Sequence, residues 1–143
     1  MKVNLVLASD ELVVRRPVWE ALSGLFLDTD VSLSRSWRIE VLAGSPYSIQ
    51  ALQTILVEEV YPVCKYNLLS MAGEWAGFDP DWLERKILHH LASSLRVLRA
   101  INLGRLTVPL SYEWRATRAG IVAARQNAAQ SSLNCPPGHC GPA

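Results

Sequence analysis

The stretch DPDWLERKILHHLASSLRVL (residues 79–98) contains the strongest helical pattern in this chain. Asp79 is a favoured N-cap residue, and Pro80 suits the first helical position, where its missing N–H is not needed. Apolar residues then recur on one face at Leu83, Ile87, Leu91, Leu95 and Leu98. With Gly104 as the stop signal, the pattern predicts one long amphipathic helix that ends just before this glycine.

The rest of the chain also shows helical signals and no convincing strand. Apolar spacings of three and four predict a helix around residues 15–28, which can begin as early as Ser9. A shorter helix precedes Gly44, and Ser48 is expected to cap another helix that runs to about residue 60.

Towards the C-terminus the signals weaken. Residues 106–112 are expected to form an extended connector, followed by a last helix over Tyr112–Gln126. The final residues are small, polar and rich in proline and glycine, which is typical of disorder. We therefore expect an all-α fold, a single-domain bundle of about five helices over residues 1–127, with a disordered C-terminal tail over 128–143.

Length and composition are those of one small domain. A chain of 143 residues, of which 50% are hydrophobic, can bury a sizeable core. No apolar run approaches the roughly 20 residues needed to span a bilayer, so no membrane partner is expected. The N-terminal apolar stretch is interrupted by Asn4 and closed by Asp10 and Glu11, which does not fit a signal peptide. With three cysteines and no disulfide framework, we expect a cytoplasmic protein.

Charge is unevenly divided along the chain. Residues 1–80 carry six Lys/Arg against ten Asp/Glu, whereas residues 81–143 carry eight against three, so the balance changes from −4 to +5. The side of the long helix opposite its leucine face carries Arg85, His89, Arg96 and Arg99. Further arginines follow at Arg105, Arg115, Arg118 and Arg125. This pattern is compatible with a solvated face paired with the acidic half of the chain, or with a surface for an acidic partner.

The residues before the long helix, NLLSMAGEWAGFD (67–79), combine glycine, aromatic and acidic residues. One interpretation is a tight corner between two helices, where Gly73 and Gly77 permit close approaches. The other is a loop that presents Glu74 and Trp75 to a partner, because tryptophan is enriched at the energetic centres of interfaces. The sequence leaves both interpretations open.

Candidates for catalysis or metal binding are weaker. An interhelical carboxylate/His site could draw on Asp28, Asp30, Glu58, Glu59, Glu74 and His90. Glu58 and Glu59 are neighbours and point about 100° apart on a helix. The same holds for His89 and His90, so neither pair has the spacing that lets two side chains on a helix share a metal.

The cysteines give no clear site either. Cys64 stands in an apolar segment and is expected to be a small buried hydrophobe. Cys135, His139 and Cys140 in the tail have no fourth ligand and no framework. Phosphate-binding glycine loops, HExxH and nucleophile elbows are also missing. We predict no catalytic residue, no metal and no cofactor, and we lean towards a protein without enzymatic activity.

Four strings carry a resemblance to a known family: RRPVWEALSGLFLDTD (15–30), GSPYS (44–48), ILVEEVYPV (55–63) and NLLSMAGEWAGFD (67–79). Over roughly residues 10–103 the chain resembles a family of small bacterial proteins with no assigned function. AGEWAGFD, within an NLL-x-x-AGEWAGFD signature, is the most distinctive part of the resemblance. The resemblance implies a bacterial cytoplasmic setting and a single small helical domain, and it brings no catalytic residue or cofactor.

The leading functional hypothesis is a non-enzymatic protein-interaction module, most concretely an immunity-type inhibitor of a bacterial toxin. Its predicted partner-binding residues are Glu74, Trp75, Arg85, His89, Arg96 and Arg99. Trp75 would be the apolar anchor and the arginines would give charge complementarity. The alternatives are the enzyme or metal-binding protein described above and a nucleic-acid-binding protein. A net charge of +1 and the lack of a helix-turn-helix pattern argue against nucleic acid. The oligomeric state stays open.

Overall fold

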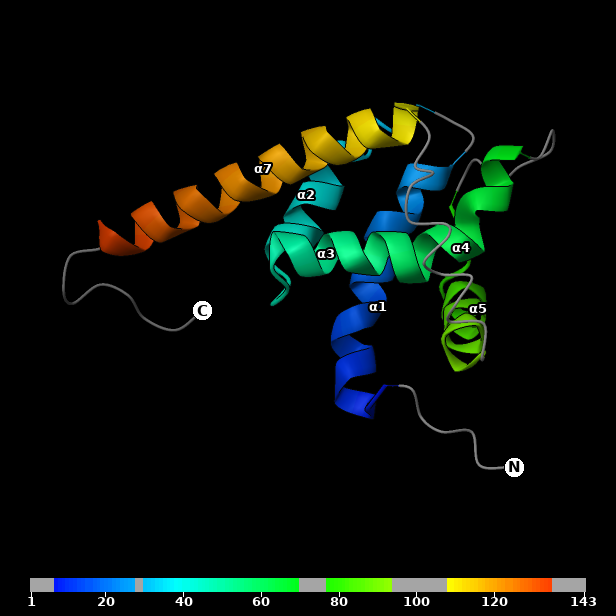
Figure 1. The fold of residues 1–143 in the computed structure, drawn as a ribbon. Helices are drawn as coiled ribbons and strands as arrows, with labels where there is room; N and C mark the ends of the chain where they lie inside the picture. Colours follow the sequence, from blue (N-terminus) through cyan, green and yellow to red (C-terminus); the bar gives the residue numbers. More distant parts are fainter. Residues whose placement is uncertain (1–6, 28–29, 70–76, 94–107, 135–143) are drawn as a thin grey trace.

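The computed structural model describes residues 7–27, 30–69, 77–93 and 108–134. In these ranges every regular element is a helix and no strand occurs, so the predicted all-α fold is confirmed. The α-helices are α1 (Ser9–Ser23), α2 (Arg35–Ala43), α3 (Ile49–Ile55), α4 (Tyr61–Cys64), α5 (Pro80–Ala92) and α7 (Val108–Leu133). They are joined in part by 3-10 segments over Gly24–Phe26 and Lys65–Leu69 and by a π-helical segment over Leu56–Val60. Figure 1 shows α7 crossing α2 and extending beyond the other helices.

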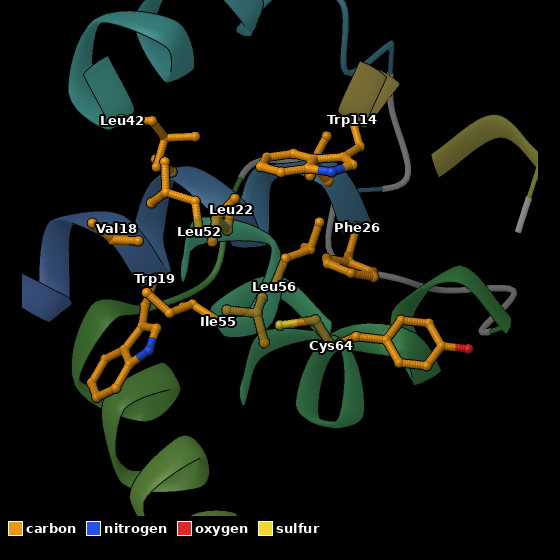
Figure 2. Packing of buried hydrophobic residues seen from close by; sticks show 14 of the residues in the cluster. Val18, Trp19, Leu22, Phe26, Leu42, Leu52, Ile55, Leu56, Cys64 and Trp114 are labelled. Carbon is orange, nitrogen blue, oxygen red and sulfur yellow. The ribbon is translucent and has the colours of Figure 1, made fainter. Parts of the chain in front are cut away.

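One hydrophobic cluster joins these helices. Its largest fully buried side chains include Trp19, Leu22, Phe26, Leu42, Leu52, Ile55, Leu56, Leu83, Ile87 and Ile121. In Figure 2, Trp114 of α7 and Trp19 of α1 lie on opposite sides of the labelled residues, with Leu22 and Leu56 between them. Because Trp114 and Ile121 both belong to the cluster, the first half of α7 is part of the packed core.

Residues 49–69 form one helical run that changes its pitch. Ser48 caps its start as predicted, since its side-chain oxygen accepts a hydrogen bond from the Ala51 N–H at 3.1 Å. The run widens into the π-helical segment Leu56–Val60, shortly before Pro62. A proline lacks the N–H for a helical hydrogen bond, and its ring clashes with the carbonyl four residues earlier. The wider turn gives that ring room without ending the run.

The helix α5 is shorter than the sequence predicted. It ends at Ala92, and Ser93 has an extended conformation with φ −70° and ψ 140°. The Ser93 hydroxyl donates to the His90 carbonyl at 2.8 Å, and local hydrogen bonds of this kind compete with helical continuation. The prediction of one uninterrupted helix up to Gly104 is therefore wrong. Residues 94–107 lie outside the described part of the chain.

The helix α7 is longer than predicted at both ends. Pro109 stands in its first turn, where a proline needs no N–H, so the expected extended connector is wrong over 108–112. The helix also continues to Leu133, so the expected tail is helical over 128–133. Alanine, which has the highest helix propensity, is frequent in this half and supports the extension. The remaining tail residues, 135–143, lie outside the described residues.

The helices α2 and α7 pack closely around a glycine and a buried arginine. A Cβ atom at Gly120 would overlap the end of the Ile39 side chain, so glycine allows the two helices to approach. Arg38 is fully buried, and its guanidinium donates to Thr117 Oγ1 at 3.2 Å and to Ser34 Oγ at 3.0 Å.

Glu113 of α7 is the counter-charge for this contact. It accepts two hydrogen bonds from Arg35, one of them from Nε at 3.1 Å, and it lies 3.9 Å from Nη1 of Arg38. Burial lowers the pKa of the Arg38 guanidinium, and the Glu113 carboxylate opposes that shift. Two arginines therefore depend on one carboxylate at the α2–α7 contact.

Arg125 corrects one prediction about the basic residues. The sequence suggested that it joins an electropositive patch, but its guanidinium points at the end of α2. It donates to the carbonyl oxygens of Leu42, Ala43, Ser45 and Tyr47 at 2.8–3.2 Å. These groups include carbonyls that a helix C-terminus leaves unpaired, so Arg125 acts as a cap for α2.

Candidate partner-binding groove

A hollow of about 830 Å³ lies between α5 and the helical run around α4. The α4 side contributes Val63, Cys64 and Tyr66, among others, and the α5 side contributes Phe78, Trp82, Lys86 and His89. We call this hollow the groove. Its volume falls in the range of ligand-binding pockets.

Local structure at the start of α5 sets the aromatic wall of the groove. Asp79 caps the helix as predicted, because its Oδ1 accepts a hydrogen bond from the Trp82 N–H at 2.7 Å. Phe78 stacks on Trp82 with ring centroids 5.8 Å apart and an interplanar angle of 10°. Gly77 has a φ of +140°, which larger residues rarely adopt, so the turn into Phe78 requires glycine.

The opposite wall contains an exposed tyrosine, Tyr66, and a buried thiol, Cys64. Tyr66 is 66% exposed, and the Lys65 ammonium lies 5.2 Å from the centre of its ring. Cys64 is buried, and burial raises the pKa of its thiol to about 12. The thiol therefore stays neutral near pH 7 and is a poor nucleophile and metal ligand. This agrees with the expectation of a small buried hydrophobe.

Two positive charges on α5, Arg85 and Lys86, form no ion pair within the part of the chain that the structure describes. Arg16 of α1 forms ion pairs with Asp81 and with Glu84, the latter at 3.1 Å between Nε and Oε2. Arg85 and Lys86 are exposed, and neither forms an ion pair with any residue in the described ranges. Arg16 thus neutralises Asp81 and Glu84 of α5. The next two residues, Arg85 and Lys86, keep their positive charge.

Two of the predicted partner-binding residues lie at or beside the groove. His89 is exposed and lines it, and Arg85 is exposed on the same helix. The other four, Glu74, Trp75, Arg96 and Arg99, lie outside the described residues, as does Arg105 of the wider basic set. Arg115 and Arg118 are exposed on α7.

The sequence prediction included His89 but not Phe78, Trp82 or Lys86, which complete the α5 wall. Trp82, Lys86 and His89 stand at positions i, i+4 and i+7, so they share one face of α5. That spacing was present in the sequence. Grouping the basic residues by charge hides it, because Trp82 carries no charge.

The carboxylates proposed for an interhelical site do not converge in the described residues. Asp30 accepts hydrogen bonds from the N–H and the hydroxyl of Ser32, and the hydroxyl bond is the main reason that its pKa is lowered. Glu59 is buried and accepts a hydrogen bond from Trp19 Nε1 at 2.7 Å. Within these ranges no three His, Cys, Asp or Glu side chains are placed to hold a metal ion. Asp28, Glu74, Cys135, His139 and Cys140 lie outside them.

Burial raises the pKa of Glu59 above its ordinary value, while the Trp19 hydrogen bond and Arg15 oppose the shift. Arg15 Nη1 lies 3.6 Å from Glu59 Oε1, and the same guanidinium lies 4.9 Å from the centre of the Tyr47 ring. Glu59 therefore holds α1 against the π-helical segment. Its adjacency to Glu58 in sequence gave no sign of this role.

These features define a small all-α domain with an open, largely apolar groove. The family described as a domain of unknown function, DUF7079, matches residues 13–120, and the chain belongs to this family. The match confirms the resemblance to a family without an assigned function, and it extends into α7, beyond the residue 103 expected from the sequence. Neither a curated protein nor a solved structure matched the chain. No helix in the described ranges is long and apolar enough to cross a membrane.

Proposed function

We propose that this protein is a non-enzymatic protein-interaction module and that its groove receives an acidic segment of a partner protein. The observation that carries the proposal is a stacked aromatic wall, Phe78 and Trp82, beside a positive edge at Arg85 and Lys86 that has no counter-charge in the described residues. Aromatic anchors and complementary charge are what interfaces use for affinity and fast association.

The chemistry of the groove specifies the chemistry of its partner segment. Apolar side chains of the segment would bury against Phe78, Trp82 and Val63, where the ordered aromatic pair loses little side-chain entropy on binding. Its carboxylates would contact Lys86 and Arg85. A segment with alternating acidic and large apolar residues meets both requirements.

We further propose, from the sequence, a bacterial cytoplasmic setting and a more specific partner. That partner is a toxin, which the protein would block as an immunity-type inhibitor. The groove supports the broader class, an interaction module for an acidic partner, and the toxin enters as the most specific member of that class.

Peptide selection tests the proposal and does not require the partner to be identified first. The full chain is immobilised, and short random displayed peptides are selected for binding to it but not to a Lys86→Glu variant. We expect the recovered peptides to combine Asp or Glu with aromatic or large aliphatic residues. A matched Arg115→Glu variant, which reverses an exposed arginine on α7 outside the groove lining, should bind them as the wild type does.

Two results would contradict the proposal. One is a set of peptides without acidic enrichment. The other is equal loss of binding in Lys86→Glu and Arg115→Glu, because that would show a general charge effect and no contribution of the groove.

A further inference from the structure

A second hollow, of about 390 Å³, lies between α3 and α7 and has a polar character that the groove lacks. The π-helical segment supplies Val57 and Glu58 to its lining. This segment directs its two acidic side chains to different surroundings, since Glu59 bonds to the buried Trp19 indole and Glu58 lines the hollow. Single π-helical turns inside helices are frequent at functional sites.

The hollow holds opposite charges that do not meet. Glu58 and Arg118 both line it, but they form no ion pair with each other or with any other residue that the structure describes. Two opposite charges that share a hollow without contact leave space for a ligand that carries both charges. An arginine fork also matches the geometry of a carboxylate.

The neutral lining residues complement these charges. Gln53 accepts a hydrogen bond from Trp114 Nε1 at 3.4 Å through Oε1, so its NH₂ group remains as a donor. The Thr54 hydroxyl donates to the Gln50 carbonyl at 3.1 Å, so its oxygen remains as an acceptor. Gln53 therefore adds a donor to Arg118, and Thr54 adds an acceptor to Glu58.

We propose that this hollow binds a free α-amino acid as a zwitterion. The carboxylate of the amino acid contacts Arg118 and Gln53, and its ammonium group contacts Glu58 and Thr54. Ile49 and Val57 provide apolar surface for an aliphatic side chain. The site shares no lining residue with the groove, so its test is independent of the protein-interaction function.

Three matched probes test the zwitterion requirement by NMR titration of the full chain. They are L-valine, isobutylamine, which lacks the carboxylate, and isovalerate, which lacks the amine. We expect saturable shifts of the amide signals around the hollow with L-valine and at least about tenfold weaker binding of each half-molecule, because each loses a charge-assisted contact.

Variants locate the site. Glu58→Gln and Arg118→Gln should each weaken L-valine binding by about tenfold or more, while Arg115→Gln and Glu40→Gln, which change exposed residues outside the hollow, should leave it unchanged. The spectrum of each variant shows directly whether it remains folded. The proposal is overturned if L-valine gives no saturable shift, if isovalerate binds as tightly as L-valine, or if the Glu58 and Arg118 variants bind L-valine like the controls.

Discussion

The α2–α7 contact and α5 both carry arginine or lysine side chains, but they differ in the partners that the described residues supply: Arg38 and Arg125 at the contact have acceptors, whereas Arg85 and Lys86 on α5 have no ion pair. Between α2 and α7, Arg38 is buried with hydroxyl, carbonyl and carboxylate acceptors, and Arg125 covers the end of α2. On α5, Arg85 and Lys86 face solvent without an ion pair in the described residues.

This difference separates structural charge from charge available for binding. A buried arginine costs a large desolvation free energy, so it persists only where acceptors surround it, and it then fixes how two helices meet. An exposed arginine beside an apolar groove stays hydrated and needs no acceptors from its own protein, so it can contact a partner. We therefore expect changes at the first region to reduce stability and changes at the second to reduce binding.

The largest effect is expected at Glu113. Glu113→Ala leaves buried Arg38 without its carboxylate, and we expect the free energy of unfolding to fall by about 3 kcal/mol, because an uncompensated buried charge remains. Urea unfolding measures this loss. The exposed Arg115→Ala on the same helix should change it by less than about 0.5 kcal/mol. Equal losses in the two variants would remove the structural role assigned to the carboxylate.

A somewhat smaller loss is expected at Arg125. Arg125→Ala removes hydrogen bonds to four carbonyl groups at the end of α2, and we expect a loss of about 2 kcal/mol, the usual contribution of charged hydrogen bonds. Arg125→Lys should recover only part of it, since a lysine cannot reproduce the planar fork. Thermal unfolding of both variants measures these losses. Full stability in Arg125→Lys would contradict the role assigned to the planar guanidinium.

Lys86→Glu should reduce binding and leave stability unchanged, in contrast to the two variants above. We expect partner or selected-peptide affinity to fall by about tenfold, mostly through slower association, while the unfolding midpoint stays within error of the wild type. Binding kinetics at low and high salt measure this effect, which should shrink as salt screens the charge. A lowered midpoint with unchanged affinity would place Lys86 among the structural charges.

The smallest effect concerns the pH dependence at Glu59. Its pKa is raised in the folded state, so the folded protein holds this proton more tightly than the unfolded chain. The resulting stability is present below the ordinary glutamate pKa and is lost as pH rises through the raised value. Glu59→Gln lacks this titration. Unfolding measured across that window should show the wild type losing stability relative to the variant, and parallel curves would contradict the assignment.

The sequence predicted which segments form helices better than it predicted where those helices begin and end. The caps at Ser48 and Asp79 were predicted correctly because each depends on a local side-chain hydrogen bond. The ends of α5 and α7 were not, because Ser93 bonds locally and the alanine-rich end of α7 has no amphipathic pattern to follow. Local spacing cannot reveal these limits.

The candidate site divides in a similar way. Helical spacing predicted His89 and Arg85 as partner-binding residues, and the structure places His89 in the groove lining. The groove itself depends on how α5 lies beside α4, and the burial of Arg38 depends on acceptors far away in sequence, such as Thr117. Contacts between distant segments are decided by packing, which a single sequence does not display.

Two tyrosines allow the most direct test of the central claim, that the groove binds a partner and the α2–α7 face does not. Tyr66 lines the groove and Tyr112 lies next to Glu113 on α7, and both are 66% exposed. Each is replaced, one at a time, by photo-reactive p-benzoylphenylalanine in the full chain, which is then irradiated in bacterial cells. We expect a discrete cross-linked protein from position 66 that disappears with Lys86→Glu, and none from position 112. Cross-links of equal yield from both positions, or from position 112 alone, would contradict it.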